Sequence, residues 1–306
     1  MQTGRAAGFD RLAKGLGFLG AAFFVPFLVL IFQGDSLHLW LYDFDIFWRG
    51  GRSLLEGTSP YQVPGFYSPL PLAVLFAPLA LLPLPVAYAI FVLASLWMLW
   101  KAAGLRSGWA LVSFPVLFTF FVGQVDLILA LSAALLGPLA LPFLLAKPQI
   151  AFVAAPWLLL HSDRRKLALG IGAMLGMLLL CFLLRPEWVS EWLASTPQRA
   201  DYARHDSNLY LLAPEGVRTT LAWILSPIAL ALGVWLRERR RSWAVLHLFT
   251  PVTNVYSAAA LAEWIGPIEM LLSWAALLAV GNDVHHGAPV FVVALAVLVR
   301  RRTEPQ

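Results

Sequence analysis

Charged residues are scarce in this sequence. Asp, Glu, Lys and Arg make up 13% of its 306 residues, about half of the share found in soluble domains. Hydrophobic residues account for 60%, and the mean hydropathy is +0.75. So little charge excludes a water-soluble globular protein and predicts an all-α integral membrane protein.

Other common features are also missing. The single cysteine, Cys181, excludes an intrachain disulfide and is expected to be a small core residue. The sequence has no P-loop, no Rossmann glycine pattern and no nucleophile elbow. His285 and His286 have only Asp283 nearby, which is too few ligands for a zinc site. We therefore expect no metal and no cofactor.

The charges that are present are segregated along the chain. Thirteen of the 22 Lys and Arg residues form four clusters beside hydrophobic segments: Arg5, Arg11 and Lys14; Arg164, Arg165 and Lys166; Arg237, Arg239, Arg240 and Arg241; and Arg300, Arg301 and Arg302. The positive-inside rule predicts that these clusters are cytoplasmic. Nine of the 17 carboxylates fall in residues 34–66 and 185–215, which we predict to be extracytoplasmic loops. The net charge of +5 then reflects membrane topology, and we expect no nucleic-acid partner.

The hydrophobic segments are numerous and short. Crossing a bilayer takes about 20 apolar residues, and the candidate spans are 16–33, 68–83, 85–103, 109–122, 124–137, 139–160, 167–184, 217–236, 243–264, 266–281 and 288–300. Splitting 243–264 into two short helices near Thr253 and Asn254 keeps the last basic cluster cytoplasmic. We predict one integral membrane domain over residues 1–306, with about 11–12 transmembrane helices.

The first loop, residues 34–66, has the pattern of an amphipathic helix lying on the membrane surface. Apolar and charged positions alternate with helical spacing: Ile46, Phe47, Leu54 and Leu55 against Arg49, Arg52 and Glu56. Asp43 or Asp45 would cap the N-terminus of this helix.

The second loop, residues 185–215, offers a similar helix. Trp188 and Trp192 are four residues apart, which predicts a surface helix with interfacial anchors. Arg204 and His205 follow it. They either contact phosphate or sugar hydroxyls or belong to a solvated loop.

Asp43 and Asp45 are the first candidates for chemistry. One hypothesis makes one of them a helix cap and the other a solvated charge. The other hypothesis places one carboxylate at a cavity, where it takes a proton from a hydroxyl nucleophile. The two residues are two positions apart and lie on different faces of a helix, so spacing alone leaves both hypotheses open.

Polar residues inside apolar segments are the second group of candidates. Lys147, in LPFLLAKPQIAF, either reaches an interface or contacts the phosphate of a lipid carrier. Gln124 and Asp126 either hydrogen-bond between helices or line the same cavity. Glu263 and Glu269 are expected to be helix-end or interhelical groups.

Three stretches of the sequence resemble glycosyltransferase family 87, the polyprenyl-phosphate-mannose-dependent mannosyltransferases. DFDIFWRGGRSLLEGTSPYQVPGFYSPLPLAVLFAPLALLP is similar to the opening signature of that family, with matches at Asp43, Phe44, Phe47, Arg52, 54–57, 60–61 and 67–69. GQVDLILALSAALL resembles its Gly-Gln-x-Asn/Asp helix start, at Gly123, Gln124 and Asp126. LLAKPQIAFVAAPWLLLHSDRRKLALG resembles its Lys-Pro helix, which ends in a basic cytoplasmic turn.

The resemblance implies a C-type glycosyltransferase, a multi-helix membrane enzyme that uses a lipid-linked sugar donor. It places the catalytic carboxylate in the first extracytoplasmic loop, at Asp43. With the polar pattern above, it suggests these substrate-binding residues: Asp45, Arg49, Arg52, Tyr61, Tyr67, Gln124, Asp126, Lys147, Arg204 and His205.

The expected reaction moves a sugar from a phosphate leaving group to a hydroxyl. Asp43 would take the hydroxyl proton, while Lys147, Arg49 or Arg204 would stabilise the departing phosphate. Direct displacement with a single base predicts inversion at the anomeric carbon. The expected partners are a polyprenyl-phosphate-sugar donor, which the resemblance implies carries mannose, a glycan or glycolipid acceptor of the cell envelope, and the lipid bilayer. The protein is then multi-pass in the cytoplasmic membrane, with its site on the extracytoplasmic side.

Two other classes of function stay open. Asp126, Lys147, Glu263 and Glu269 are the groups that an ion-coupled secondary transporter would use. Such a transporter is expected to have halves related by a repeat, and the sequence shows none. A non-catalytic lipid-binding membrane protein is the third hypothesis.

Overall fold

The computed structural model describes residues 41–199, 213–250, 256–279 and 288–300, together with 8, 11–12, 15–17 and 19–20. Over these residues the chain forms helices and no strand, which confirms the predicted all-α class. In chain order the elements are α3 (Tyr42–Leu55), η1 (Pro60–Gln62), α4 (Leu70–Ala80), α5 (Leu84–Ala103), η2 (Gly104–Arg106), α6 (Ser107–Leu111), α7 (Phe114–Val122), α8 (Asp126–Leu136), η3 (Gly137–Ala140), α9 (Leu141–Leu144), α10 (Pro148–His161), α11 (Arg164–Leu184), α12 (Trp188–Arg199), α13 (Glu215–Trp235), α14 (Arg239–Leu248), η6 (Ser257–Trp264), α15 (Pro267–Ala279) and α16 (Ala288–Val299).

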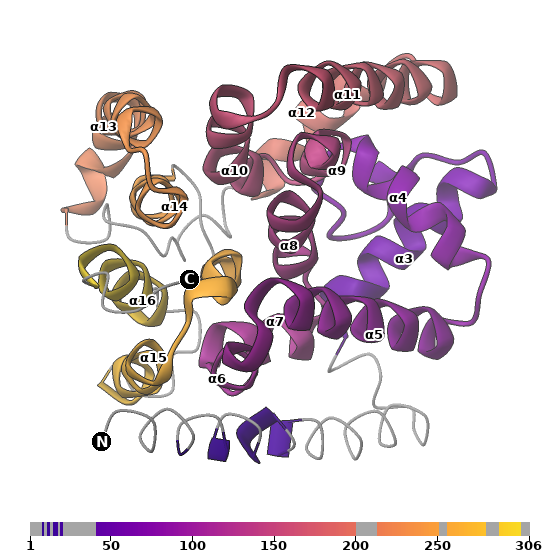
Figure 1. Ribbon diagram of the computed structural model, residues 1–306. Helices are drawn as coiled ribbons and strands as arrows, with labels where there is room; N and C mark the ends of the chain where they lie inside the picture. The colour runs from indigo at the N-terminus through magenta and orange to yellow at the C-terminus, as the bar shows by residue number, and fades with distance from the viewer. Residues whose placement is uncertain are drawn as a thin grey trace.

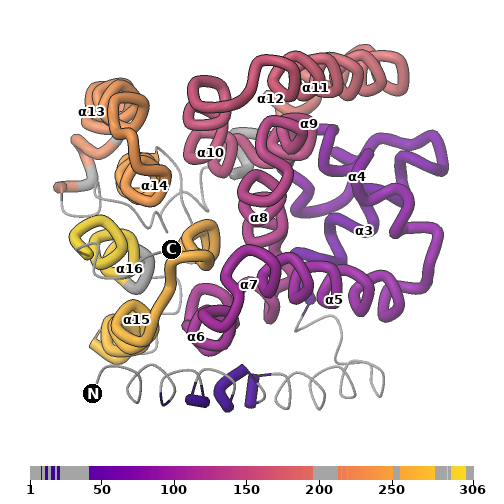
Figure 2. Tube along the Cα trace, viewed as in Figure 1, coloured from indigo at the N-terminus to yellow at the C-terminus, as the bar shows by residue number. Residues whose placement is uncertain are grey.

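The helices form two groups with a central set between them (Figure 1). Helices α3, α4 and α5 lie on one side, and α13 to α16 lie on the other. Between them stand α7 to α10, the segments that carry Gln124, Asp126 and Lys147. The tube in Figure 2 shows α11 and α12 running along one edge of this arrangement. The central helices that carry Gln124, Asp126 and Lys147 thus lie between helices from the early and the late parts of the chain.

Three helical stretches are long and apolar enough to cross a membrane: Leu84–Leu111, Asp126–Leu144 and Arg164–Leu184. In Arg164–Leu184, only 11% of the most apolar window is buried by protein, as expected of a helix that faces lipid. The predicted spans 85–103 and 167–184 coincide with α5 and α11. The predicted span 16–33 lies largely outside the described residues, and the total number of spans stays a prediction.

The predicted span 124–137 coincides with α8, but the predicted span 139–160 is wrong. No single helix covers 139–160, because α9 ends at Leu144 and α10 begins at Pro148. Lys147 has an extended backbone (φ −147°, ψ 95°). The ring of a proline disfavours helical geometry in the residue before it. Pro142 occupies the first turn of α9, where its missing N–H breaks nothing.

The chain reverses its direction between α8 and α10. A straight helix over Asp126–Leu144 would be about 27 Å long, yet Lys147 forms an ion pair with Asp126 at the start of α8. Gly137 caps α8 with φ +59°, a backbone conformation open to glycine and costly for other residues. Helix α8 therefore leads the chain away from Asp126, and η3 and α9 return it to the beginning of α8.

Two other predicted spans are also divided. The segment 109–122 contains the end of the five-residue helix α6 and all nine residues of α7, and each of these helices is too short to cross a bilayer. The prediction of a single span there is wrong. The segment 243–264 is split as predicted, because α14 ends at Leu248 and η6 begins at Ser257.

The predicted amphipathic helix of the first loop is confirmed as α3. Its apolar residues Phe44, Ile46 and Phe47 are buried, and the helix packs closely along α4. The expected carboxylate cap is wrong: the N-cap is Leu41, and both Asp43 and Asp45 lie in the first turn, where their charge favours the helix dipole.

The two predicted extracytoplasmic loops contact each other. The hydroxyl of Ser59 donates to Glu191 of α12 at 3.1 Å, and the guanidinium of Arg185 holds the same carboxylate through both of its oxygens. The indole N–H of Trp192 donates to the carbonyl oxygen of Tyr67 at 3.0 Å. The helix predicted from Trp188 and Trp192 is confirmed, but Trp188 is buried.

Packing between α3 and α4 depends on Gly51. A Cβ atom there would lie 2.7 Å from the backbone carbonyl carbon of Phe76, which α4 holds in place. We expect Gly51→Ala to separate the two helices and to lower the free energy of unfolding by about 1–3 kcal/mol. Gly172→Ala, at an open helical position of α11, is the control and should leave stability unchanged or raise it. Equal melting temperatures of the two purified variants in detergent would contradict this packing.

Candidate active site

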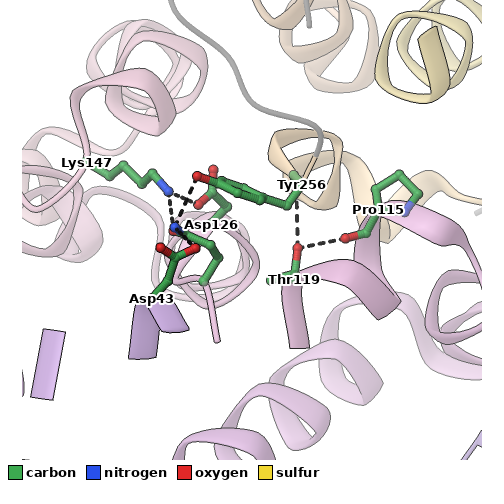
Figure 3. Close-up of polar contacts among 7 residues, drawn as sticks. Asp43, Pro115, Thr119, Asp126, Lys147 and Tyr256 are labelled. Atoms are coloured by element: carbon green, nitrogen blue, oxygen red, sulfur yellow. Dashed lines mark hydrogen bonds and ion pairs between the residues drawn. The ribbon is translucent and has the colours of Figure 1, made fainter. Parts of the chain in front are cut away.

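The polar residues of the site come from helix ends that meet at one point. Asp43 is the second residue of α3, Asp126 is the first residue of α8, and Lys147 directly precedes α10. Tyr256 stands just before η6. Figure 3 shows these four side chains turned toward one another. Helix N-termini carry unpaired N–H groups and positive dipole ends, so the point where they meet favours carboxylates.

The two acidic residues of α3 have different surroundings, as their spacing predicts. Asp43 lies on the packed face of the helix, one and two turns from Phe47 and Gly50. Asp45 lies on the other face, where its carboxylate pairs with Arg49 at 2.8 Å. The side chain of Arg49 is half exposed. The structure therefore brings Asp43, and not Asp45, to the polar centre.

Gly123 allows the turn between α7 and α8 to reach α3. Its φ is +76°, a left-handed conformation that favours glycine. A Cβ atom at this position would collide with the Cβ of Phe44. The close approach places the next residue, Gln124, directly on Asp43.

Gln124 connects three groups of the site. Its Nε2 amide donates to Oδ2 of Asp43 at 2.7 Å and to the hydroxyl of Tyr256 at 3.1 Å. Its Oε1 accepts from the ammonium of Lys147 at 2.5 Å. Because an ammonium can only donate, Lys147 fixes the orientation of the amide, and the amide N–H must then face Asp43.

Lys147 is buried within this polar centre. Its ammonium forms an ion pair with Oδ2 of Asp126, contacts Gln124 and lies 4.8 Å from the ring centroid of Tyr256. Its side chain is 9% exposed, and that of Asp126 is 0% exposed. The ammonium of Lys147 is therefore held by protein groups and does not extend into solvent. The alternative that Gln124 and Asp126 hydrogen-bond within the bundle is confirmed.

Tyr256 is the member of the site that sequence reasoning missed. Its carbonyl oxygen lies 3.3 Å from the hydroxyl of Thr119 in α7, which helps to position the ring over Lys147 (Figure 3). The sequence signal was the polar interruption at Thr250–Asn254. That interruption indicated buried or cavity-lining backbone, but it did not say which aromatic residue would follow it into the site.

The carboxyl of Asp43 is enclosed by protein and still partly accessible. Burial raises its pKa from 3.8 to about 6, opposed by the hydrogen bond from Gln124 and by the charge of Lys147. Oδ2 is held by Gln124, while Oδ1 has no hydrogen-bond partner among the described residues. An accessible carboxylate with one free oxygen and a pKa close to neutrality is suited to accept a proton.

The other predicted site residues lie away from this centre. Arg52 pairs with Glu56 on the exposed face of α3. Tyr61 packs against Phe66, and burial raises the pKa of its hydroxyl, which is buried without a partner. Tyr67 contributes its carbonyl oxygen to the contact with α12. Arg204 and His205 lie outside the described residues, as does the histidine pair 285–286.

The late acidic residues are interhelical, as predicted. Glu263 pairs with Arg239 of α14. Glu269 accepts from the N–H of Gly266 at 2.9 Å and lies 3.5 Å from the guanidinium of Arg300. Within the described ranges, His, Cys, Asp and Glu side chains form no group of three that could hold a metal ion.

Comparison with protein families gives a match over much of the chain. The model described as glycosyltransferase family 87 matches residues 66–262, nearly two thirds of the chain. The match contains Gln124, Asp126, Lys147 and Tyr256 but begins after Asp43. No curated protein and no solved structure matches the chain.

The raised pKa of Asp43 has a consequence for stability. Because its folded pKa of about 6 exceeds the ordinary 3.8, its contribution to folding is complete below about pH 4 and is lost as the pH rises through 6. The amide of Asp43→Asn does not titrate, so the variant does not lose this stability as the pH rises. We expect the melting temperature of the variant, relative to wild type, to rise by about 2–5 °C between pH 4.5 and pH 7.5.

The matched control is Asp45→Asn on the opposite face of α3, where the carboxylate pairs with the half-exposed Arg49. The melting temperature of Asp45→Asn should not rise relative to wild type over the same pH range. A pH-independent difference between Asp43→Asn and wild type would show that the folded protein does not perturb the carboxyl of Asp43.

Proposed function

The chain belongs to glycosyltransferase family 87 and is a membrane glycosyltransferase, and we propose that it transfers mannose from a polyprenyl-phosphate donor to a hydroxyl of a glycan or glycolipid. The proposed base is Asp43. The observation that carries this proposal is the state of its carboxylate: one oxygen is held by Gln124, and the other has no described partner. A base must be oriented and still able to accept.

The proposed step is a single displacement. The acceptor hydroxyl gives its proton to Oδ1 of Asp43, and the acceptor oxygen forms a bond to the anomeric carbon of the sugar. The bond between that carbon and the phosphate oxygen breaks, and its electron pair leaves with the polyprenyl phosphate. Attack from the face opposite the phosphate inverts the configuration, so a β-linked donor gives an α-mannoside.

The position of Asp43 suits a donor that is anchored in lipid. It lies in an amphipathic helix that packs on the apolar α4 and beside α5. A polyprenyl chain dissolves in the bilayer while its sugar stays at the surface, so the reacting carbon and a base at a helix terminus can meet there. The two acidic loops and their mutual contacts support a site on the extracytoplasmic side of the cytoplasmic membrane, within a cell-envelope pathway.

The departing phosphate needs positive groups near Asp43 to stabilise its negative charge. Arg49 and Arg52 point to the exposed face of α3, opposite Asp43. Contacts from Arg204 and His205 stay a prediction. A donor phosphate entering beside Asp43 would also meet the positive dipole ends of α8 and α10.

The transporter hypothesis has less support. Its four intramembrane groups do not form one path: Asp126 pairs with Lys147, whereas Glu263 and Glu269 each interact with their own arginine. The family match also belongs to glycosyltransferases. A non-catalytic lipid-binding role would make the raised pKa of Asp43 incidental.

The proposal is tested by sugar transfer in membrane vesicles supplied with polyprenyl-phosphate-mannose. We expect Asp43→Asn to lower the rate at least about 10³-fold, because the proton of the acceptor then has no base. Asp45→Asn should retain most of the activity. For wild type, kcat/KM should fall about tenfold per pH unit below pH 6, and the product should be the α-anomer. Equal transfer by Asp43→Asn and wild type would remove Asp43 as the base.

A further inference from the structure

A buried row of polar groups stands behind Asp43. It runs from Asp126 through the ammonium of Lys147 to the amide of Gln124 and ends on Oδ2 of Asp43. We propose that Gln124 and Lys147 are positioning residues, which hold the carboxylate of Asp43 with its free oxygen toward the acceptor and keep it ionised near neutral pH. This inference rests on the proposed role of Asp43 as the base.

The amide of Gln124 orients the carboxylate of Asp43. Held by Lys147 through Oε1, it can offer only N–H groups to Asp43. A hydrogen bond donated to a carboxylate favours the ionised form and immobilises the oxygen that accepts it. Tyr256 receives the second N–H at 3.1 Å, so both donors of the amide are used. The amide therefore cannot rotate without breaking contacts on both sides.

The ammonium of Lys147 is fully occupied within the protein. It has three N–H bonds, and it meets three groups: Oε1 of Gln124, Oδ2 of Asp126 and the ring of Tyr256. It therefore acts on Asp43 through Gln124 rather than by contacting the donor phosphate. This assigns Lys147 a different task from the phosphate contact expected from the sequence.

Asp126 makes the buried ammonium possible. An unpaired cation in this apolar bundle would be strongly destabilising, and the carboxylate beside it offsets that cost. Its Oδ1 is buried without a hydrogen-bond partner. A pair that leaves one oxygen unsatisfied is a poor device for stability. The pair instead holds the ammonium of Lys147 where it contacts the amide of Gln124.

Several charged and titratable groups surround Asp43. From the elements packed around it come Asp126 of α8, Lys147 before α10 and Tyr256 before η6. On α5, the hydroxyl of Tyr88 is bonded to the carbonyl of Phe120, and its ring contacts Phe44. On α3 itself, Asp45 and Arg49 pair on the opposite face. Lys147 is the positive charge in this set that opposes the protonation of Asp43.

The first test is Gln124→Glu, a change of similar shape. The new carboxylate still accepts from Lys147 but faces Asp43 with an acceptor and a negative charge. We expect the pKa of Asp43 to rise by at least about one unit. The acid limb of the kcat/KM profile should move to higher pH by the same amount. Loss of rate at pH 7 should then be partly recovered near pH 9.

The second test removes the ammonium without leaving a bare charge. Lys147→Met alone exposes Asp126 as an unpaired buried carboxylate and can unfold the protein, so the double variant Lys147→Met/Asp126→Asn is used. It should fold and lose at least about tenfold in kcat at pH 7 with little change in KM. Lys147→Arg, which keeps charge and donors, should restore part of the activity.

The matched control is a second, partly buried ion pair, Arg239 with Glu263. It resembles the first pair, because its cation also lies over aromatic rings, those of Trp243 and Trp264. Arg239 contacts the carbonyl of Ala134, well along α8 from Asp126. The double variant Arg239→Met/Glu263→Gln should affect stability alone and leave the pH profile unchanged.

A direct titration separates this inference from the proposed function. The infrared carbonyl band of protonated Asp43, identified by its loss in Asp43→Asn, gives the pKa without any activity assay. A pKa that stays unchanged in both Gln124→Glu and the Lys147/Asp126 double variant overturns the inference. A pKa that shifts supports it, even if Asp43→Asn proves fully active and the role of Asp43 as base is lost.

Discussion

The structure depends on one buried cation. The ammonium of Lys147 sits among apolar helices, and it is tolerated because a carboxylate, an amide oxygen and an aromatic face surround it. Meeting these demands brings three chain segments to the same place. Helices that would otherwise continue are interrupted there, at Gly123, at Lys147 and before Tyr256. Non-helical backbone is acceptable at such a place only because protein encloses it.

Much of the fold could be predicted from the sequence where the pattern was local. The apolar spacing that places Phe44 and Phe47 inside determines α3, and the i, i+2 spacing correctly separated Asp43 from Asp45. Long apolar runs located α5 and α11. These features follow from helical periodicity and hydropathy, which need no knowledge of distant neighbours.

The errors occurred where a distant contact decides the outcome. Pro142 and Pro148 each lie in the first turn of a helix, and the break between those helices falls at Lys147, whose side chain meets a distant partner. The reversal at Gly137 depends on where Lys147 must return, which local spacing does not report. For Gln124 and Asp126 local spacing left two alternatives open, hydrogen bonds between helices or a shared cavity, and the contacts with Lys147 decide for the first. Tyr256 was missed because its partner lies more than 100 residues earlier in the chain.

The reversal between α8 and α10 also affects how the protein is assembled. It brings the ammonium, the amide and the carboxylate into a single short segment, residues 124–147. Short-range contacts lose little loop entropy and form early. On the nascent chain, this segment can close against α3 while Tyr256 has yet to be synthesised. The acid–base centre is then built by the first half of the protein, and the second half completes it by covering a charge that is already neutralised.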